Sequence, residues 1–559
     1  MNFNHFFTND EIQNLIQSWC ETYPQLIKSE SIGTSHENRS IWLLKITNWN
    51  SGGDLEKPAL WIDANIHATE LTGTTCALYV AYQLLTGYGT DERITNLLDR
   101  SVLYIVPRVN PDGAALAMAP TPRYIRSGVR LYPWEEKDEG LHVQDINQDG
   151  KILQMRLPDP NGDWKISTLD PRLMEKRGPD EHTGIFYRLL SEGLIEDYDG
   201  YLIKEARTPE GLDFNRNFPF QWRTEGEQHG AGPYPASEPE IRALVDFISR
   251  HPNINIALTF HTFSRVILRP YSTKSDDDII PEDLWIFKKM GEIGTRSSGY
   301  RCVSTFHDFK YHPKEVTTGA FDDWVYDHLG IYSFTIELWD LPTEAGIKDR
   351  KWIEWWREHP HSEDVQILKW IDEHGEPDSY MEWQEHDHPQ LGKLEIGGWN
   401  SIHSWRNPPA AQLESEVSRH FPFVLSLGSM LPCLTLHTIK VESLGNDDYR
   451  LTVVVENNGF LPSFTSEQAK SRQAVRPVRI ELDLPEEAKI INGKRRVQIG
   501  QLEGRSNKLS VSSIYSTSPT DNRGKAEWVI HVPHGSAVTV AVLSERAGII
   551  KREVQLVSQ

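Results

Sequence analysis

A histidine and a glutamate three residues apart are the first residues of this sequence that could do chemistry together. His67 and Glu70 lie between the apolar run 59–66, which predicts a short buried strand, and residues 71–85, whose apolar positions suit a buried helix. At such a junction both side chains can converge on one point above the strand end. A neutral imidazole and a carboxylate held together are two of the three protein ligands of an open His2Glu zinc site, in which water fills the fourth position.

The spacing alone does not decide between a metal site and an ordinary pair of polar residues at a strand end. With 21 histidines in the chain, about one or two H-x-x-E matches are expected by chance. A second match occurs at His312 and Glu315, but no predicted strand and helix surround it. The context favours the first match, and both interpretations stay open at this point.

Two further residues lie at or near the ends of predicted strands. His261 closes the apolar run 254–261, where a single histidine is more often structural than functional. Glu337 is the one acid inside the apolar run 331–338. Burying a carboxylate costs several kcal/mol unless it is paired, bound to a metal or facing a cleft, so Glu337 is a site candidate in its own right.

The elements that must position these residues alternate between strand and helix. Continuous apolar strands are predicted at 41–46, 59–66 and 101–107, with a helix after the second. This order predicts an α/β fold with a mixed central sheet and helices on both faces, in which ligands bind beyond the carboxyl ends of the strands. His67 and Glu70 lie at such an end.

At 559 residues the chain is too long for one ordinary core, and its composition and hydrophobic pattern change along its length. Residues 1–430 have the features of the α/β domain. Within them, residues 114–212 are polar and rich in Asp, Gly and Pro, which predicts a long surface insertion. In residues 431–559 short alternating strands are separated by turn residues, which predicts an all-β sandwich.

The insertion contains D-I-N-Q-D-G-K-I, which is similar to the first half of a calcium-binding loop. Asp145, Asn147 and Asp149 place oxygen atoms at alternate positions before a glycine. The twelfth position is Arg156, where such a loop needs a bidentate carboxylate. Both Ca²⁺ and a solvated turn are compatible with the pattern, and the missing carboxylate favours the turn.

The composition excludes several classes of partner. The chain has 58 basic and 80 acidic residues, a formal net charge of −22, and no basic run, so we expect neither nucleic acid nor a membrane as partner. No apolar run reaches spanning length, and the N-terminus lacks the pattern of a secretion signal. Four scattered cysteines do not suggest a disulfide framework. We therefore expect a soluble cytoplasmic protein, and its oligomeric state is left open.

Six motifs occur in one order along residues 8–345. They are H-A-T-E, N-P-D-G, L-D-F-N-R-N-F, S-E-P-E, the strand that carries His261, and T-I-E-L-W-D. Together they resemble the zinc metallocarboxypeptidases of the carboxypeptidase A/B type, here as a bacterial-type member with a C-terminal β-sandwich domain. The resemblance implies one Zn²⁺ per chain, held by His67, Glu70 and His261, and a peptide substrate with a free C-terminal carboxylate.

The resemblance also implies roles for four other residues. Glu337 matches the general base that takes the proton of the attacking water. Asn215 and Arg216 match the residues that hold the terminal carboxylate of the substrate, which an arginine can bind through two hydrogen bonds. Asp213 matches the carboxylate that orients a zinc-binding histidine, here His67.

Two residues of the family pattern are harder to place in this sequence. Arg126 is the best match to the arginine that stabilises the developing oxyanion, with Arg123 and Arg130 as alternatives. The tyrosine that covers the bound carboxylate has no match, because counting back along the chain reaches Glu315, and the nearest tyrosine, Tyr311, lies four residues earlier.

The family's specificity positions can be found by the same counting from Glu337. They fall on Asp322 and Ser272, and a slip of one residue would replace Asp322 by Asp323. Members of the family that prefer basic residues carry an acid at this place. The resemblance therefore implies a preference for C-terminal Lys or Arg.

Two other classes of function are compatible with the sequence. A zinc amide hydrolase acting on N-acyl amino acids or cell-wall peptides would need the same metal site. A binding protein could use the β-sandwich and carry an inert zinc domain. Glu337 argues against a binding protein, because burying an acid costs free energy that nothing would offset in an inert site.

Overall fold

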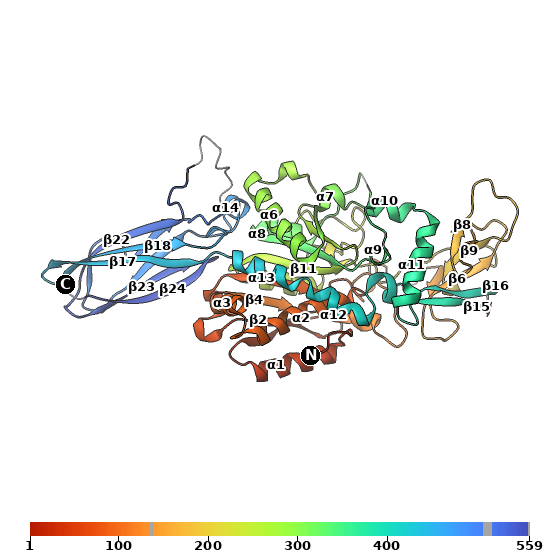
Figure 1. The fold of residues 1–559 in the computed structure, drawn as a ribbon, viewed down its shortest axis with the longest axis horizontal. Helices are drawn as coiled ribbons and strands as arrows, with labels where there is room; N and C mark the ends of the chain where they lie inside the picture. Colours follow the sequence, from red (N-terminus) through yellow and green to blue (C-terminus); the bar gives the residue numbers. More distant parts are fainter. Residues whose placement is uncertain (135, 137, 313, 507–516, 557–559) are drawn as a thin grey trace.

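The computed structural model describes residues 1–134, 136, 138–312, 314–506 and 517–556. Three parts follow one another along the long axis of the molecule (Figure 1). The central part is an α/β body, a β-sandwich made of the C-terminal strands lies at one end, and a smaller β layer lies at the other.

The central part is built on an eight-stranded sheet with the order β1-β2-β4-β3-β11-β14-β12-β13. Its four middle strands are mutually parallel, and antiparallel strands flank them on both sides. The sheet is therefore mixed, which confirms the predicted fold class. The strands are β1 (Ile27–Thr34), β2 (Ser40–Ile46), β3 (Ala59–Ala64), β4 (Val102–Val106), β11 (Ile254–Thr262), β12 (Val266–Arg269), β13 (Arg301–Ser304) and β14 (Tyr332–Leu338).

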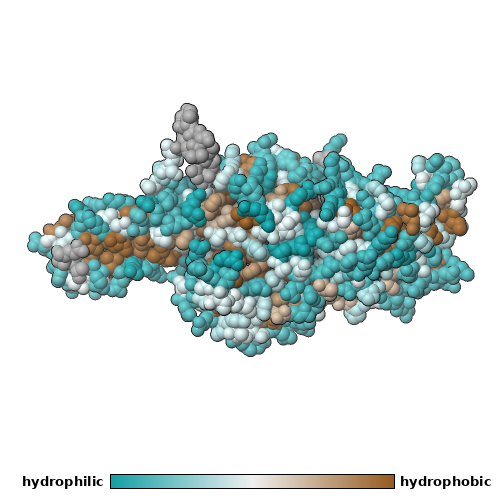
Figure 2. Space-filling view, viewed as in Figure 1, coloured by the Kyte–Doolittle hydropathy of each residue, from teal (hydrophilic) through white to brown (hydrophobic). Residues whose placement is uncertain are grey.

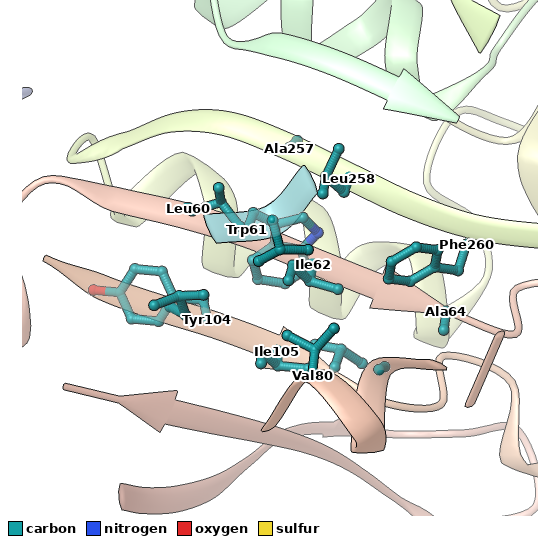
Figure 3. Close-up of a cluster of buried hydrophobic side chains, with 14 of the residues drawn as sticks. Leu60, Trp61, Ile62, Ala64, Val80, Tyr104, Ile105, Ala257, Leu258 and Phe260 are labelled. Carbon is teal, nitrogen blue, oxygen red and sulfur yellow. The ribbon is translucent and has the colours of Figure 1, made fainter. Parts of the chain in front are cut away.

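Helices cover both faces of this sheet. Every residue of β3 and β11 is buried, and successive side chains of a strand point to opposite faces. Phe247 of α5 (Pro239–Arg250) packs on Trp61 with ring centroids 5.7 Å apart. On the other face α2 (Leu71–Gly87) packs against Ala64. Figure 3 shows the apolar side chains of this core.

Further helices surround the sheet or connect its strands. No described helix combines the length and the apolarity that a membrane crossing requires. The helices are α1 (Asn9–Thr22), α3 (Glu92–Arg100), α4 (Pro111–Ala117), α6 (Pro281–Ser298), α7 (Thr305–Asp308), α8 (Phe321–Leu329), α9 (Leu341–Glu344), α10 (Trp352–Arg357), α11 (His361–His374), α12 (Ala410–Ser418), α13 (Phe421–Met430) and α14 (Glu467–Ser471).

The predicted insertion 114–212 contains β-strands that share a sheet with a distant segment. A six-stranded sheet has the order β15-β16-β6-β9-β7-β8, and β10 pairs with β5 beside it. The strands of these two sheets include six within residues 114–212, and because each of those six has only three to five residues, the sequence showed only their polar composition. The strands of both sheets are β5 (Gly140–Val143), β6 (Gln154–Pro158), β7 (Trp164–Ile166), β8 (Met174–Lys176), β9 (Tyr187–Ser191), β10 (Gly193–Glu196), β15 (Tyr380–His388) and β16 (Gly392–Trp399).

The candidate calcium loop forms a turn within this layer. Asp145 accepts hydrogen bonds from the backbone N–H groups of Asp149 and Gly150, at 3.2 and 2.9 Å. Arg156, at the position of the missing carboxylate, pairs instead with Glu395 on β16 through two hydrogen bonds of 2.8 and 2.9 Å. The loop oxygens thus stabilise the turn, and calcium is not supported.

The C-terminal part is an all-β sandwich of two antiparallel four-stranded sheets, with orders β17-β18-β22-β20 and β21-β19-β23-β24. Its buried residues form a cluster of their own, so it has a separate core. Figure 2 shows a band of hydrophobic residues along its flank, whereas the central part is mostly hydrophilic on this face. The boundary at residue 430 stays a prediction. The strands are β17 (Leu434–Gly445), β18 (Asp448–Asn457), β19 (Val478–Asp483), β20 (Lys489–Asn492), β21 (Arg496–Gly500), β22 (Arg523–His531), β23 (Ala537–Ser544) and β24 (Gly548–Gln555).

Candidate active site

Three side chains converge at the carboxyl ends of β3 and β11. His67 and Glu70 occupy the turn between β3 and α2, and His261 lies near the end of β11. His67 Nδ1 lies 2.9 Å from one Glu70 oxygen and 3.1 Å from His261 Nδ1, which is itself 3.1 Å from the other Glu70 oxygen. Each residue is at most 3% exposed. The structure thus brings together the three predicted metal ligands.

This donor set fits Zn²⁺. Burial alone would raise the pKa of the Glu70 carboxyl, but His67 and His261 hold that pKa well below its usual range. An ionised carboxylate and two imidazole nitrogens therefore face one another away from solvent, and a shared cation would stabilise this concentration of lone pairs. Two histidines and a glutamate are the ligand set of open catalytic zinc sites.

Asp213 holds the far side of the His67 ring. Its Oδ1 lies 3.2 Å from His67 Nε2, which leaves Nδ1 directed at the other two ligands. Burial raises the pKa of the Asp213 carboxyl, but the neighbouring arginines and His67 hold it well below its usual range. An ionised carboxylate accepts the Nε2 proton and so favours the tautomer whose Nδ1 can bind a metal.

Glu337 lies beside this cluster. It is the register partner of His261 on the parallel strand β14 and is partly buried. Burial raises the pKa of its carboxyl to about 7; His261 and Arg126 oppose the rise, and the negative charge of Glu70 adds to it. A carboxyl that titrates near neutrality is suited to exchange protons with a substrate.

Of the three candidate arginines, only Arg126 reaches the cluster. Its Nε donates to Asp213 Oδ2 at 2.8 Å, and its Nη1 lies 3.5 Å from Glu70 Oε1. About a third of the side chain is exposed. Arg123 and Arg130 form ion pairs with other carboxylates away from the cluster.

Asn215 and Arg216 lie on a single helical turn, Phe214–Arg216, which is capped by the side chain of Asp213. Asn215 Oδ1 accepts a hydrogen bond of 2.8 Å from the backbone N–H of Phe321, and no described residue accepts from its NH2 group. Arg216 donates to the Asn215 carbonyl at 2.7 Å and lies 3.7 Å from Asp213. This arrangement leaves the amide and part of the guanidinium free to bind an anion.

The predicted specificity residues are all buried at the start of α8 and beyond β12. Asp323 accepts hydrogen bonds from the Ser272 N–H at 2.8 Å and from the Thr273 hydroxyl at 3.2 Å. Asp322 accepts one from the N–H of Asp323 at 3.0 Å, and its other oxygen is 3.5 Å from the Thr335 hydroxyl. The hydrogen bonds of Asp323 stabilise the turn at Ser272 and Thr273, so Asp322 is the acid with more hydrogen-bonding capacity left for a ligand.

Tyr311, which counting along the sequence did not place, belongs to the same neighbourhood. Its ring is half exposed, yet its hydroxyl lies among the charges of the site. Burial raises the pKa of this phenol, Arg126 and Arg216 lower it, and Glu337 raises it. Counting along the sequence had reached Glu315, four residues further along the chain.

The sequence analysis also missed Arg406. Its guanidinium lies 4.8 Å from the centre of the Phe263 ring and 5.2 Å from that of Tyr124, and it donates to the Tyr124 hydroxyl at 2.8 Å. Its charge lowers the pKa of Glu337. No motif marks Arg406, because a single arginine far along the chain carries no pattern.

Comparisons with known proteins agree with this geometry. A zinc carboxypeptidase family model matches residues 12–355, and a model for a domain of unknown function matches residues 433–555. Mouse carboxypeptidase A2 is 27% identical over 349 residues, which are 61% of this chain and 64% of that protein. Bovine carboxypeptidase B2 is 26% identical over 347 residues, 60% of this chain and 64% of that protein.

One similar solved structure is that of bovine thrombin-activatable fibrinolysis inhibitor in complex with tick carboxypeptidase inhibitor. The two chains are 23% identical, and the match covers 66% of this chain and 97% of that chain, with a TM-score of 0.39. The chain spans slightly less than two thirds of the length of the curated relatives named above. The family match itself covers more than half of the chain and includes the metal cluster and Glu337. The chain therefore belongs to the zinc carboxypeptidase family.

Proposed function

We propose that this protein is a zinc-dependent carboxypeptidase that hydrolyses the C-terminal bond of peptides. The observation that carries the proposal is the convergence of His67, Glu70 and His261 with Glu337 as the next residue across the sheet. Three ligands alone could form a structural site. The added carboxyl, which titrates near neutrality, supports catalysis.

The residues of this chain would divide the work as follows. Arg216 and the Asn215 amide bind the terminal carboxylate, and the Tyr311 hydroxyl covers it. Zinc held by His67, Glu70 and His261 would supply a Lewis acid, able to polarise a carbonyl and to lower the pKa of water. Glu337 accepts a proton from the attacking water and delivers it to the leaving amine. Arg126 stabilises the negative charge that develops on the carbonyl oxygen.

We further propose that C-terminal Lys or Arg is preferred. Asp322 is 4% exposed, and one of its oxygens has only a distant hydroxyl as partner, so a cationic side chain would provide the missing charge. Matched peptides ending in Lys, Phe and Glu test this preference. The Lys peptide should be cleaved best, and Asp322→Asn should reduce its kcat/KM without affecting the Phe peptide. Faster cleavage of the Phe or Glu peptide would reject it.

The proposed activity is tested by metal analysis combined with a peptide-library digest, with and without a chelator. We expect about one zinc per chain and release of single C-terminal residues that stops on chelation and returns with zinc. Cleavage of N-acyl amino acids or cell-wall peptides but not of ordinary peptides would favour the other zinc amide hydrolases. A zinc-loaded protein that hydrolyses none of them would be a binding protein. A cytoplasmic location stays a prediction for separate measurement.

A further inference from the structure

The segment that carries Arg406 lies outside both matched regions, which end at residue 355 and begin at residue 433. Arg406 is the last residue of a π-helical turn, Ile402–Arg406, and such turns occur frequently at functional sites. The next residue, Asn407, fixes the turn to the metal-binding region. It accepts from the Thr72 N–H at 3.0 Å and donates to the Thr69 carbonyl at 2.8 Å. An added segment is thus anchored beside the zinc ligands.

The Arg406 guanidinium is held in place but keeps its charge available. Phe263 and Tyr124 contact it, and Tyr124 accepts one of its hydrogen bonds. Among the described residues no carboxylate forms an ion pair with it. Because two rings position the guanidinium, little conformational freedom would be lost when it binds an anion.

The anchor of the Arg406 segment and the proposed carboxylate clamp are held by helices on opposite faces of the sheet. Asn215 is bonded to the start of α8, which packs on the face of β14 that carries Ser333 and Thr335. Asn407 is bonded to the start of α2, which packs on the other face of the sheet. A peptide whose terminal carboxylate lies at the clamp would therefore extend across the cluster toward Arg406.

The space beyond Arg406 can hold more of such a peptide. A cavity of about 630 Å³ adjoins it, and its walls include Tyr124, Trp405, Trp399 and parts of the β layer formed by residues 140–196 and 380–399. Tyr124, which lines the cavity, also accepts a hydrogen bond from Arg406, so the guanidinium lies next to the cavity wall.

We propose that Arg406 forms a subsite that binds a carboxylate side chain of the substrate, so that the protein selects peptides with Asp or Glu immediately before the C-terminal residue. The inference rests on the proposed carboxypeptidase function. A guanidinium binds a carboxylate through two parallel hydrogen bonds, which gives both affinity and geometric selection. Charged hydrogen bonds of this kind correspond to a preference of about 10- to 100-fold.

The test compares two peptides that differ only in the residue before a C-terminal lysine, Glu in one and Ala in the other. For the zinc-loaded wild-type protein we expect kcat/KM to favour the Glu peptide by about 10- to 100-fold, mostly through KM. Arg406→Gln should abolish this preference and leave the Ala peptide within about threefold, whereas Arg406→Lys should retain part of it. The matched control is Arg93→Gln, whose side chain is 74% exposed on α3.

Binding measured by calorimetry in a Glu337→Gln background gives a second readout that does not need turnover. The Glu peptide should bind more tightly than the Ala peptide, and Arg406→Gln should remove the difference. Equal kcat/KM for both peptides, or an equal loss of kcat/KM for both in Arg406→Gln, would overturn the inference. Arg406 would then act through its charge on Glu337 and not on the substrate side chain. If neither peptide were cleaved, the proposed function would fail, and the binding preference alone would decide the role of Arg406.

Discussion

The metal cluster and the rim that faces it are built in different ways. His67, Glu70 and His261 come from strands or the turn after a strand, and each is at most 3% exposed. Arg126 comes from an irregular segment and Arg406 from the end of a short π-helical turn, and both are partly exposed. Rigid elements hold catalytic groups accurately, whereas loops can change without disturbing the core. The cluster is thus suited to supply the chemistry and the rim to select the substrate.

Removing Glu337, the proposed general base, is the strongest way to test the chemical half of this comparison. In Glu337→Gln we expect kcat to fall about 10²- to 10⁴-fold, because an amide cannot take the proton of the attacking water. Zinc content should not change, since Glu337 is not one of the three ligands. Steady-state kinetics and metal analysis of the same sample measure both. Full activity in this variant would remove Glu337 from the mechanism.

Arg126 belongs to the rim by exposure but would act on the chemistry by charge. Arg126→Gln should lower kcat about 10²- to 10³-fold with little change in KM, because a donor to the developing oxyanion acts mainly in the transition state. The exposed residue Arg93 provides the control substitution. A change in KM alone would place Arg126 with the substrate-selecting residues and sharpen the division between the two regions.

Asp213 links the two regions, because it contacts both His67 and Arg126. Asp213→Asn should weaken zinc binding about 10- to 100-fold, since the amide no longer accepts the Nε2 proton as strongly as a carboxylate does. Competition with a chromogenic chelator measures the affinity, and activity at saturating zinc separates this loss from a loss of catalysis. Unchanged affinity would mean that the β3–α2 turn alone orients His67.

The same division explains how much of the site could be predicted from the sequence. His67, Glu70, His261 and Glu337 could be located because each lies on or just after an apolar strand, and parallel strands bring their carboxyl ends to one edge of a sheet. The family resemblance then supplied their roles. Fold class followed from the same apolar runs.

The rim could not be predicted in this way. Tyr311 was named only as the nearest tyrosine, because counting along the chain reached Glu315. Arg406 was missed because its contacts with Tyr124 and Phe263 join segments far apart in the chain. The strands of residues 114–212 were missed because each has only three to five residues, and because the pairing that ties them to the rest of the chain, β6 with β16, joins residues far apart in the sequence. Local pattern carries no information about such pairings.

The smallest predicted effect concerns the cost of burying an acid in the rigid half. Glu240 at the start of α5 is 1% exposed; its Oε1 accepts from the His36 N–H at 2.9 Å, and its Oε2 has no partner among the described residues. Burial raises the pKa of this carboxyl to about 7. The folded state therefore retains a proton that the unfolded state has lost, and stability falls as pH rises from the ordinary value of 4.5 to about 7.

A neutral residue at this position should not carry that cost. Glu240→Gln keeps the acceptor for the His36 N–H. At pH 8 we expect its free energy of unfolding, measured by urea denaturation, to exceed that of the wild type by up to about 3 kcal/mol, and near pH 4 we expect the two free energies to be equal. The control is Glu227→Gln at an exposed position, which should change neither value. A destabilised Glu240→Gln at pH 8 would show that the charged carboxylate supports the frame beneath the metal cluster, and that the rigid half depends on buried charge as well as on apolar packing.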